Sequence, residues 1–180
     1  MNAKDLIGKK IIDKNVKDLA KLAEIDINIK TFSISNLYGS IGNPINKKYY
    51  NIPSESILAV GDYIQVGKTT EELESEMLEK IPETEGNIIK LNSLIGKTVL
   101  NSEGNITGKV INVEVDFKKK AVCGIRIASS TSSFGQNKTQ TLLSKEDITS
   151  IGDYVLINKV FEVEKEESED SEESVKINVE

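Results

Sequence analysis

The chain has 180 residues, of which 38% are hydrophobic, and it carries a net charge of −6, one cysteine and no histidine. This inventory excludes the usual zinc sites and the Ser-His and Cys-His nucleophile pairs, so we expect no enzymatic activity, no metal and no other cofactor. No stretch approaches the roughly 18 consecutive apolar residues of a membrane-spanning helix, and residues 1–10 lack the apolar core of a secretory signal. We therefore expect a soluble, cytoplasmic protein.

Two short motifs occur twice, in the same order. Leu-Ile-Gly-Lys at residues 6–9 recurs at residues 94–97, and Val-Gly-Asp-Tyr-Ile at residues 60–64 recurs as Ile-Gly-Asp-Tyr-Val at residues 151–155. Self-similarity at a nearly constant spacing indicates a tandem repeat of one domain. The predicted organisation is a first domain over residues 1–67, an acidic linker over 68–90, a second domain over 91–161 and an acidic tail over 162–180.

The first repeat has the pattern of short strands. Residues 5–13 indicate a tight turn followed by a strand, and in residues 23–34 Ile25, Ile27 and Ile29 alternate with polar residues, which predicts one strand with a buried face. Residues 36–48 are rich in Gly, Asn and Pro and are expected to form a loop. A strand over 49–53, a helical turn over 54–58 and a last strand over 63–66 complete the repeat.

The linker contains the best helix candidate in the chain. Thr69 and Glu72 have capping-box spacing, and Leu73, Met77 and Leu78 form a narrow apolar stripe. The pattern predicts a helix over residues 69–80. A short helix of this kind gains little stability alone, so we expect its stripe to pack on a domain or on a second subunit, and we expect a homodimer.

The second repeat follows the same plan. Residues 102–105 have a turn sequence between strands at 98–100 and 109–117, and three lysines at 118–120 form the tip of a hairpin whose returning strand covers 121–128. Residues 129–139 are expected to form a mobile loop. Segments at 141–143, 145–148 and 154–157 match the end of the first repeat.

Short strands joined by turns favour antiparallel pairing closed into a small barrel. The predicted fold class is all-β, with two tandem small antiparallel β-barrels, a short linker helix and a disordered acidic C-terminal tail. The repeated motif residues are expected to hold turns together; they are Gly8, Gly61, Asp62, Tyr63, Gly96, Gly152, Asp153 and Tyr154.

Few residues are candidates for chemistry or binding. Cys123 alternates with apolar residues and has no histidine to activate it, so we expect a buried structural thiol. Asp147 and Asp153 could form a carboxylate pair only if folding brings them together. Phe134, in a polar loop, either is an exposed contact residue or packs on its own domain.

The end of the acidic tail differs from the rest of it. Val175, Ile177 and Val179 alternate with polar residues as in a strand. This segment either adds to the sheet of a partner or is an unengaged terminus.

The motifs together resemble the PRC-barrel family. Its pattern begins with a Leu-hydrophobic-Gly-Lys strand, continues through a D-x-x-G-x-x-x-G-x-V turn and strand, and ends at I-G-D-hydrophobic-V. In the second repeat Asn101, Gly104 and Gly108 match the middle of that pattern, followed by Lys109 and Val110. In the first repeat Asp13 and Asn15 are present, but Leu19 and Ala20 replace a turn residue and a glycine, so we expect the first hairpin to differ there.

The resemblance implies a binding module. Family members include the photosynthetic reaction-centre H subunit, a ribosome-maturation factor and stand-alone archaeal proteins. A soluble tandem chain resembles the archaeal adaptors of cell division, which connect a SepF-like protein and its FtsZ ring to further PRC-barrel proteins. The implied function is a non-enzymatic adaptor with a SepF-like division protein or another PRC-barrel protein as its partner, located in the cytoplasm at the division site.

The alternative is a ribosome- or RNA-associated role like that of the maturation factor. Lys118, Lys119 and Lys120 support it, but a hairpin tip with three lysines also discourages edge pairing. The chain contains a single arginine, Arg126, and arginine is the side chain best suited to phosphate and base contacts. We therefore expect no strong nucleic-acid binding, and no direct membrane insertion.

Overall fold

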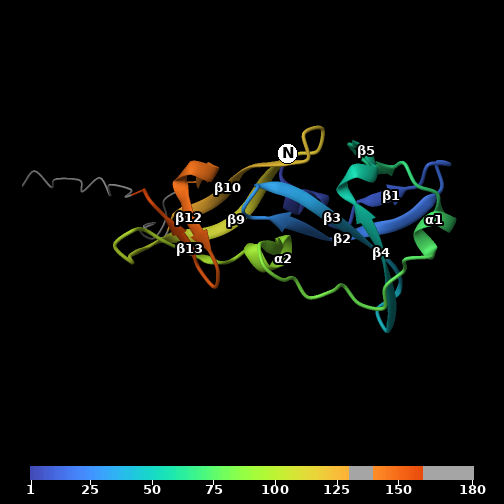
Figure 1. Cartoon of the computed structure of the whole chain (residues 1–180), viewed down its shortest axis with the longest axis horizontal. Helices are drawn as coiled ribbons and strands as arrows, with labels where there is room; N and C mark the ends of the chain where they lie inside the picture. Colours follow the sequence, from blue (N-terminus) through green and yellow to red (C-terminus); the bar gives the residue numbers. More distant parts are fainter. Residues whose placement is uncertain (130–139, 160–180) are drawn as a thin grey trace, which may run out of the picture.

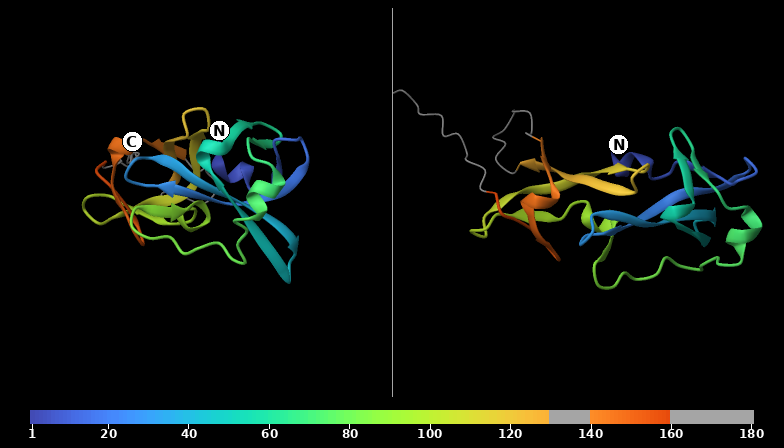
Figure 2. Two further views of the ribbon diagram at one scale, coloured as in Figure 1. Left: turned by 45° about the vertical axis from the view of Figure 1, so that its right-hand side comes forward. Right: turned by 45° about the horizontal axis from the view of Figure 1, so that its top comes forward.

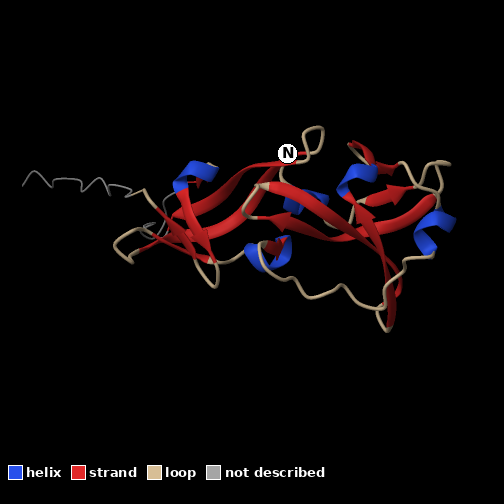
Figure 3. Ribbon diagram, in the orientation of Figure 1, coloured by secondary structure: helices blue, strands red, loops and turns tan. Residues whose placement is uncertain are grey.

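The computed structural model describes residues 1–129 and 140–159. Strands dominate these residues (Figure 3). We name residues 1–67 half one and residues 88–159 half two. The two halves lie side by side along the long axis of the molecule, with half one at the blue end and half two at the yellow and orange end (Figure 1).

The order of elements in half one recurs in half two. Half one contains η1 (Ala3–Leu6), β1 (Lys10–Ile12), β2 (Asp18–Asn28), β3 (Ser33–Asn43), β4 (Asn46–Pro53), η2 (Ser54–Ser56), β5 (Ile57–Val60) and β6 (Ile64–Val66). After α1 (Thr70–Glu74), half two contains β7 (Ile88–Lys90), α2 (Leu91–Leu94), β8 (Thr98–Leu100), β9 (Ile106–Asp116), β10 (Ala121–Ser129), β11 (Gln140–Leu143), η3 (Lys145–Asp147), β12 (Ile148–Ile151) and β13 (Val155–Ile157).

The strand pairing also recurs. In half one β2 pairs with β1 and β3, β3 with β4, and β5 with β6, all antiparallel, while β1 and β6 are parallel. In half two β9, β8, β10, β11, β12 and β13 take the same places, with β8 and β13 parallel. The described strands are thus mostly but not wholly antiparallel, and they join into one open sheet that runs from β12 to β5. A mostly β chain is confirmed, but closure of each half into a barrel is not established.

Corresponding turns have the same hydrogen bonds. Asp13 Oδ1 accepts from the main-chain nitrogens of Asn15 and Lys17 at 2.8 and 2.9 Å. Asn101, 88 positions later, accepts from Glu103 and Asn105 at 3.0 and 2.9 Å. The first hairpin of half one therefore keeps the geometry of its counterpart, although its sequence departs from the family pattern.

One core extends through both halves. Buried apolar side chains alternate along the strands, as expected for sheets with one buried face. The largest fully buried side chains are Leu6, Ile11, Leu22, Ile25, Ile27, Leu37, Ile52, Ile64, Leu73, Leu91, Leu94 and Ile125.

Two predictions for half one were wrong. The segment 36–48, expected to be a loop, is the hairpin of β3 and β4, and its turn is formed by Pro44 and Ile45. Two of its glycines are required by the backbone. A Cβ on Gly39 would lie 2.8 Å from the Cβ of Ala20 on β2, and Gly42 has φ +88. The strand expected over 23–34 is two strands joined by a turn at residues 29–32.

The linker helix is shorter than predicted. Only Thr70–Glu74 is helical, although the capping box of Thr69 and Glu72 is present. Leu73 is fully buried, which confirms that the apolar stripe packs on the molecule. Leu78 and Tyr49 then exchange two main-chain hydrogen bonds of 2.8 Å, which attach the linker to β4.

Beyond Leu78 the linker runs along the outside of the sheet and returns at α2 (Figures 1 and 2). Its last residues form β7, in the region expected to be linker, and β7 pairs with β2 of half one. None of the helices in the described ranges is both long and apolar enough to cross a membrane.

Candidate interaction site at the junction of the halves

Strand β3 of half one pairs with strand β10 of half two at Ser33 and Ala121. Ile34 donates its N–H to Lys120 O at 2.9 Å, and Val122 donates to Phe32 O at 2.8 Å. Ser33 and Ala121 are 88 positions apart, the spacing between the two Leu-Ile-Gly-Lys motifs. Each residue therefore pairs with its own counterpart, which is the geometry of a local two-fold axis. We call the set of contacts between the halves the junction.

The start of the chain lies on half two. Val115 on β9 donates to Met1 O at 2.8 Å, Met1 N donates to Val115 O at 3.2 Å, and Asn2 bridges to Glu114. The following turn, η1, packs on β9. The first residues of half one thus extend the sheet of half two.

The reverse exchange occurs on the other side of the axis. β7 of half two pairs antiparallel with β2 of half one, so that Lys90 faces Asp26, and α2 packs on β2. Lys90 is the counterpart of Asn2, and Asp26 is the counterpart of Glu114. Each half therefore contributes an equivalent segment to the sheet of the other.

Two side chains fix these segments in place. Asn112 Oδ1 accepts from Lys4 N at 3.1 Å and from Val113 N at 2.8 Å. In half one its counterpart Glu24 accepts through Oε1 from Asn92 N at 3.1 Å and from its neighbour Ile25 N at 3.0 Å. Both side chains are buried, and each satisfies its accepting oxygen with main-chain donors, as buried polar groups usually do.

The half-one side of the junction buries a carboxyl group. Asp26 is 4% exposed; its Oδ2 accepts from the Tyr38 hydroxyl at 2.8 Å, and its Oδ1 has no hydrogen-bond partner. Burial raises the pKa of Asp26, while the Tyr38 hydrogen bond and the charge of Lys90 oppose that rise. Burial and the adjacent carboxylate also raise the pKa of Tyr38.

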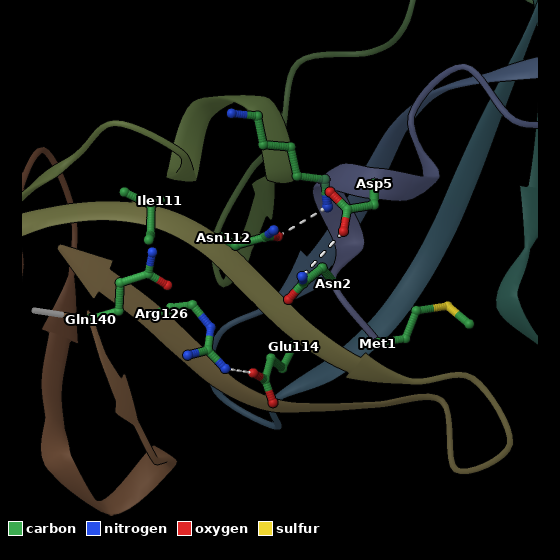
Figure 4. Close-up of a pocket in the computed structure, with 9 residues that line it drawn as sticks. Met1, Asn2, Asp5, Ile111, Asn112, Glu114, Arg126 and Gln140 are labelled. Carbon is green, nitrogen blue, oxygen red and sulfur yellow. Dashed lines mark hydrogen bonds and ion pairs between the residues drawn. The ribbon is translucent and has the colours of Figure 1, made fainter. Parts of the chain in front are cut away.

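The half-two side has a different pair at the same place. Glu114 and Arg126, the counterparts of Asp26 and Tyr38, form an ion pair. They line an open pocket of about 680 Å³ between η1, β9 and β10 (Figure 4). Its other lining residues are Met1, Asn2, Lys4, Asp5, Ile111, Asn112 and Gln140. The two sides of the junction therefore share a backbone arrangement but differ in the position of the cation, which is Lys90 of the added strand on one side and Arg126 of β10 on the other.

The repeated motif residues lie at turns away from the junction. Gly8 and Gly96 have φ +86 and +88, which favours glycine. Gly61 N–H donates to Tyr63 O at 3.0 Å, and Gly152 N–H donates to the oxygen of its own tyrosine at 2.9 Å. In these turns Asp62 and Asp153 are exposed, and Tyr63 and Tyr154 are 50% and 56% exposed.

Two further candidates are resolved by the structure. Cys123 is exposed, so the prediction of a buried thiol was wrong. The register shifts between Val122 and Gly124, and this bulge interrupts the in-out alternation on which the prediction depended. Asp147 is 8% exposed and pairs with Lys159 at 2.7 Å, whereas Asp153 is an exposed turn residue.

Four predicted binding residues lie outside the described ranges: Phe134, Val175, Ile177 and Val179. The junction residues were not predicted from the sequence. The signal that could have found them is the sequence alignment of the two halves, in which Asn2 is equivalent to Lys90 and Glu24 is equivalent to Asn112.

Comparison with known families gives one result. Residues 86–167 match the model of the PRC-barrel domain. The match covers half two and includes β7, the strand that pairs with β2 of half one. No curated protein matches the chain. Half two is thus similar to a domain family whose presence suggests a protein-interaction module.

Proposed function

We propose that this chain is a non-enzymatic adaptor that binds other proteins. The similarity of residues 86–167 to the PRC-barrel domain supports an interaction role. The recurrence of the same pairing scheme in both halves supports two modules of one kind, each a small barrel. On this view the chain has two similar binding surfaces.

The observation that carries the proposal is the exposure of one tyrosine at the equivalent turn of each half. Tyr63 and Tyr154 are 50% and 56% exposed. Tyrosine is enriched among the residues that dominate protein interfaces. In half one, Leu58 on the edge strand β5 is also 63% exposed, which adds a second large exposed side chain to the same hairpin.

The proposed partners are those of archaeal cell division: a SepF-like protein, its FtsZ ring or another PRC-barrel protein. The resemblance of the tandem motifs to those adaptors supports this assignment. We further propose that the protein acts in the cytoplasm at the division site, as a homodimer. The alternating segment with Val175, Ile177 and Val179 would add a strand to a partner's sheet, and Phe134 would contact the partner.

Affinity capture from cells, followed by mass spectrometry, tests this function. We expect the full chain to recover a division protein and the double variant Tyr63→Ala/Tyr154→Ala to recover less of it. Because both side chains are largely exposed, the variant should keep its free energy of unfolding within about 0.5 kcal/mol. Ile45→Ala, at a turn residue that is 97% exposed, serves as the matched control. Recovery of ribosomal proteins alone would refute the division assignment.

A ribosome- or RNA-associated role is the second candidate. Lys118 and Lys119 are exposed at the turn between β9 and β10, where the Nζ of Lys119 lies 4.0 Å from an Asp116 carboxylate oxygen. If this surface binds RNA, affinity should fall steeply between low and moderate salt. Absence of RNA binding at low salt would remove this candidate.

A further inference from the structure

We propose that the junction is a self-complementary interface that accepts a second copy of this chain. Half one of one copy would pair with half two of the other, and the converse pair would form at the same time, giving an exchanged dimer. This inference concerns self-association and does not depend on the adaptor function.

The symmetry of the junction is the first argument. An interface is isologous when both partners use the same surface patch, so that every contact occurs twice, once on each side of the two-fold axis. The junction has this property at its axis, through Ser33 and Ala121, and at both flanks, through Asn2 with Glu114 and Lys90 with Asp26. The same contacts can therefore join halves of separate copies, in competition with the pairing inside one chain.

The linker is the second argument. Between Leu78 and β7 nearly all residues are exposed, and their ion pairs are Lys48 with Glu79 at 3.2 Å and Lys90 with Glu83 at 3.8 Å. Both glutamates are more than three-quarters exposed, and ion pairs of this kind contribute little. Rerouting this segment from one copy to another therefore breaks few stabilising contacts, as in domain swapping.

The charges at the flanks are the third argument, because they determine which halves pair. In a contact between two copies of half one, Asn2 would replace Lys90 opposite Asp26, so the favourable charge of Lys90 would be missing near that buried carboxyl group. In a contact between two copies of half two, Lys90 would face Glu114, which is already paired with Arg126. Only the pairing of half one with half two places Lys90 opposite Asp26. An exchanged dimer should therefore pair half one of each copy with half two of the other.

Disulfides at the axis distinguish the three pairings. Ser33 and Ala121 face each other without a main-chain hydrogen bond between them, because the bonds are made by their neighbours. The Cα atoms of such an antiparallel pair lie about 4.5 Å apart, which is within the range for disulfides. Two full-length variants are needed, Ser33→Cys and Ala121→Cys, each combined with Cys123→Ser because the native thiol is exposed. A pair of unlike halves gives a 33–121 disulfide, while pairs of like halves give 33–33 or 121–121 disulfides.

The experiment mixes the two variants in urea, refolds them together at high concentration and oxidises them. We expect interchain 33–121 dimers that increase with protein concentration and exceed each like-half dimer several-fold, because only the unlike pairing keeps the charge of Lys90 opposite Asp26. Adding Lys90→Asn to both variants should bring the three products towards statistical proportions. Lys80→Asn, at an exposed linker position, should leave them unchanged.

Two results would overturn the proposal. The first is correctly refolded protein, shown by its circular dichroism and unfolding curve, that gives no interchain 33–121 disulfide at any concentration. The second is a statistical mixture of the three disulfides before Lys90 is changed. Loss of partner proteins in affinity capture would affect the adaptor function but would leave both of these readouts intact.

Discussion

Ser33 pairs across the junction with Ala121, the residue that occupies its own position in the other half. A residue meets its counterpart only on a two-fold axis, so this one pair defines the symmetry by which the flanking segments are exchanged. The same symmetry explains why the two halves share one core and one sheet.

The symmetry also identifies a strained residue. Val16 has φ 63 and is 69% exposed, while its counterpart in half two, Gly104, has φ +81. A β-branched residue is unfavourable in this conformation. We expect Val16→Gly to raise the free energy of unfolding by about 0.5 to 1 kcal/mol, measured by urea denaturation.

The matched change in half two should have the opposite sign. Gly104→Val should lower the free energy of unfolding by about 1 to 2 kcal/mol, because no contact at this open position compensates for the strained backbone. If both substitutions changed the free energy of unfolding in the same direction, the two turns would not be equivalent.

Asp26 should make stability depend on pH. Because its folded-state pKa is raised, its contribution is fully present below the unfolded pKa and is lost as the pH rises through the folded pKa. Asp26→Asn keeps an acceptor for Tyr38 and removes the titration. We therefore expect the wild type to lose stability relative to Asp26→Asn as the pH is raised from acid to neutral.

Urea denaturation of both proteins across this range measures the difference. Comparing the two cancels the opposite contribution of Asp13 and Asp147, whose pKa values are lowered by the Lys17 main-chain hydrogen bond and by the Lys159 hydrogen bond respectively. A difference that does not change with pH would contradict the assignment of a raised pKa to Asp26.

The buried acceptors of the junction should matter equally in the two halves. Glu24→Ala and Asn112→Ala each leave two main-chain donors without an acceptor, and each should lower the free energy of unfolding by about 2 kcal/mol. Glu24→Gln keeps the accepting oxygen and should cost clearly less. A large effect in one half and none in the other would count against the reciprocal exchange.

Cys123 should react in the folded protein. Because its side chain is exposed on β10, a thiol reagent should modify one group per chain without denaturant, at a rate that unfolding raises only a few-fold. Cys123→Ser should abolish the reaction. A thiol that reacts only in denaturant would restore the sequence-based prediction of burial.

Much of the architecture could be predicted because local chemistry determines it. The turn at Asn101 follows from a side chain that caps main-chain nitrogens. The equivalent turn at Asp13 was expected to differ, and it instead has the same hydrogen bonds. The buried faces of the strands follow from the alternation of residues such as Ile25 and Ile27. The capping box fixed the start of α1 but not its length, since the end of a short helix depends on packing.

The failures have physical reasons as well. Gly39 lies within a strand because it allows the close approach of Ala20, which composition alone cannot distinguish from a loop. Cys123 faces outward because of a bulge, and bulges reverse a two-residue period without a clear sequence signal. The junction depends on pairings between residues far apart in the sequence, namely Asp26 with Lys90, Ser33 with Ala121 and Asn2 with Glu114, so only the comparison of the halves could have indicated it.

The most direct measurement is an oxidation of the double variant Ser33→Cys/Ala121→Cys in the Cys123→Ser background, at low protein concentration. If the halves of one chain pair at the axis, an intrachain disulfide should form rapidly and the product should remain a monomer on a non-reducing gel and by mass spectrometry. Two thiols that stay free in folded protein would contradict the symmetric junction on which this account depends.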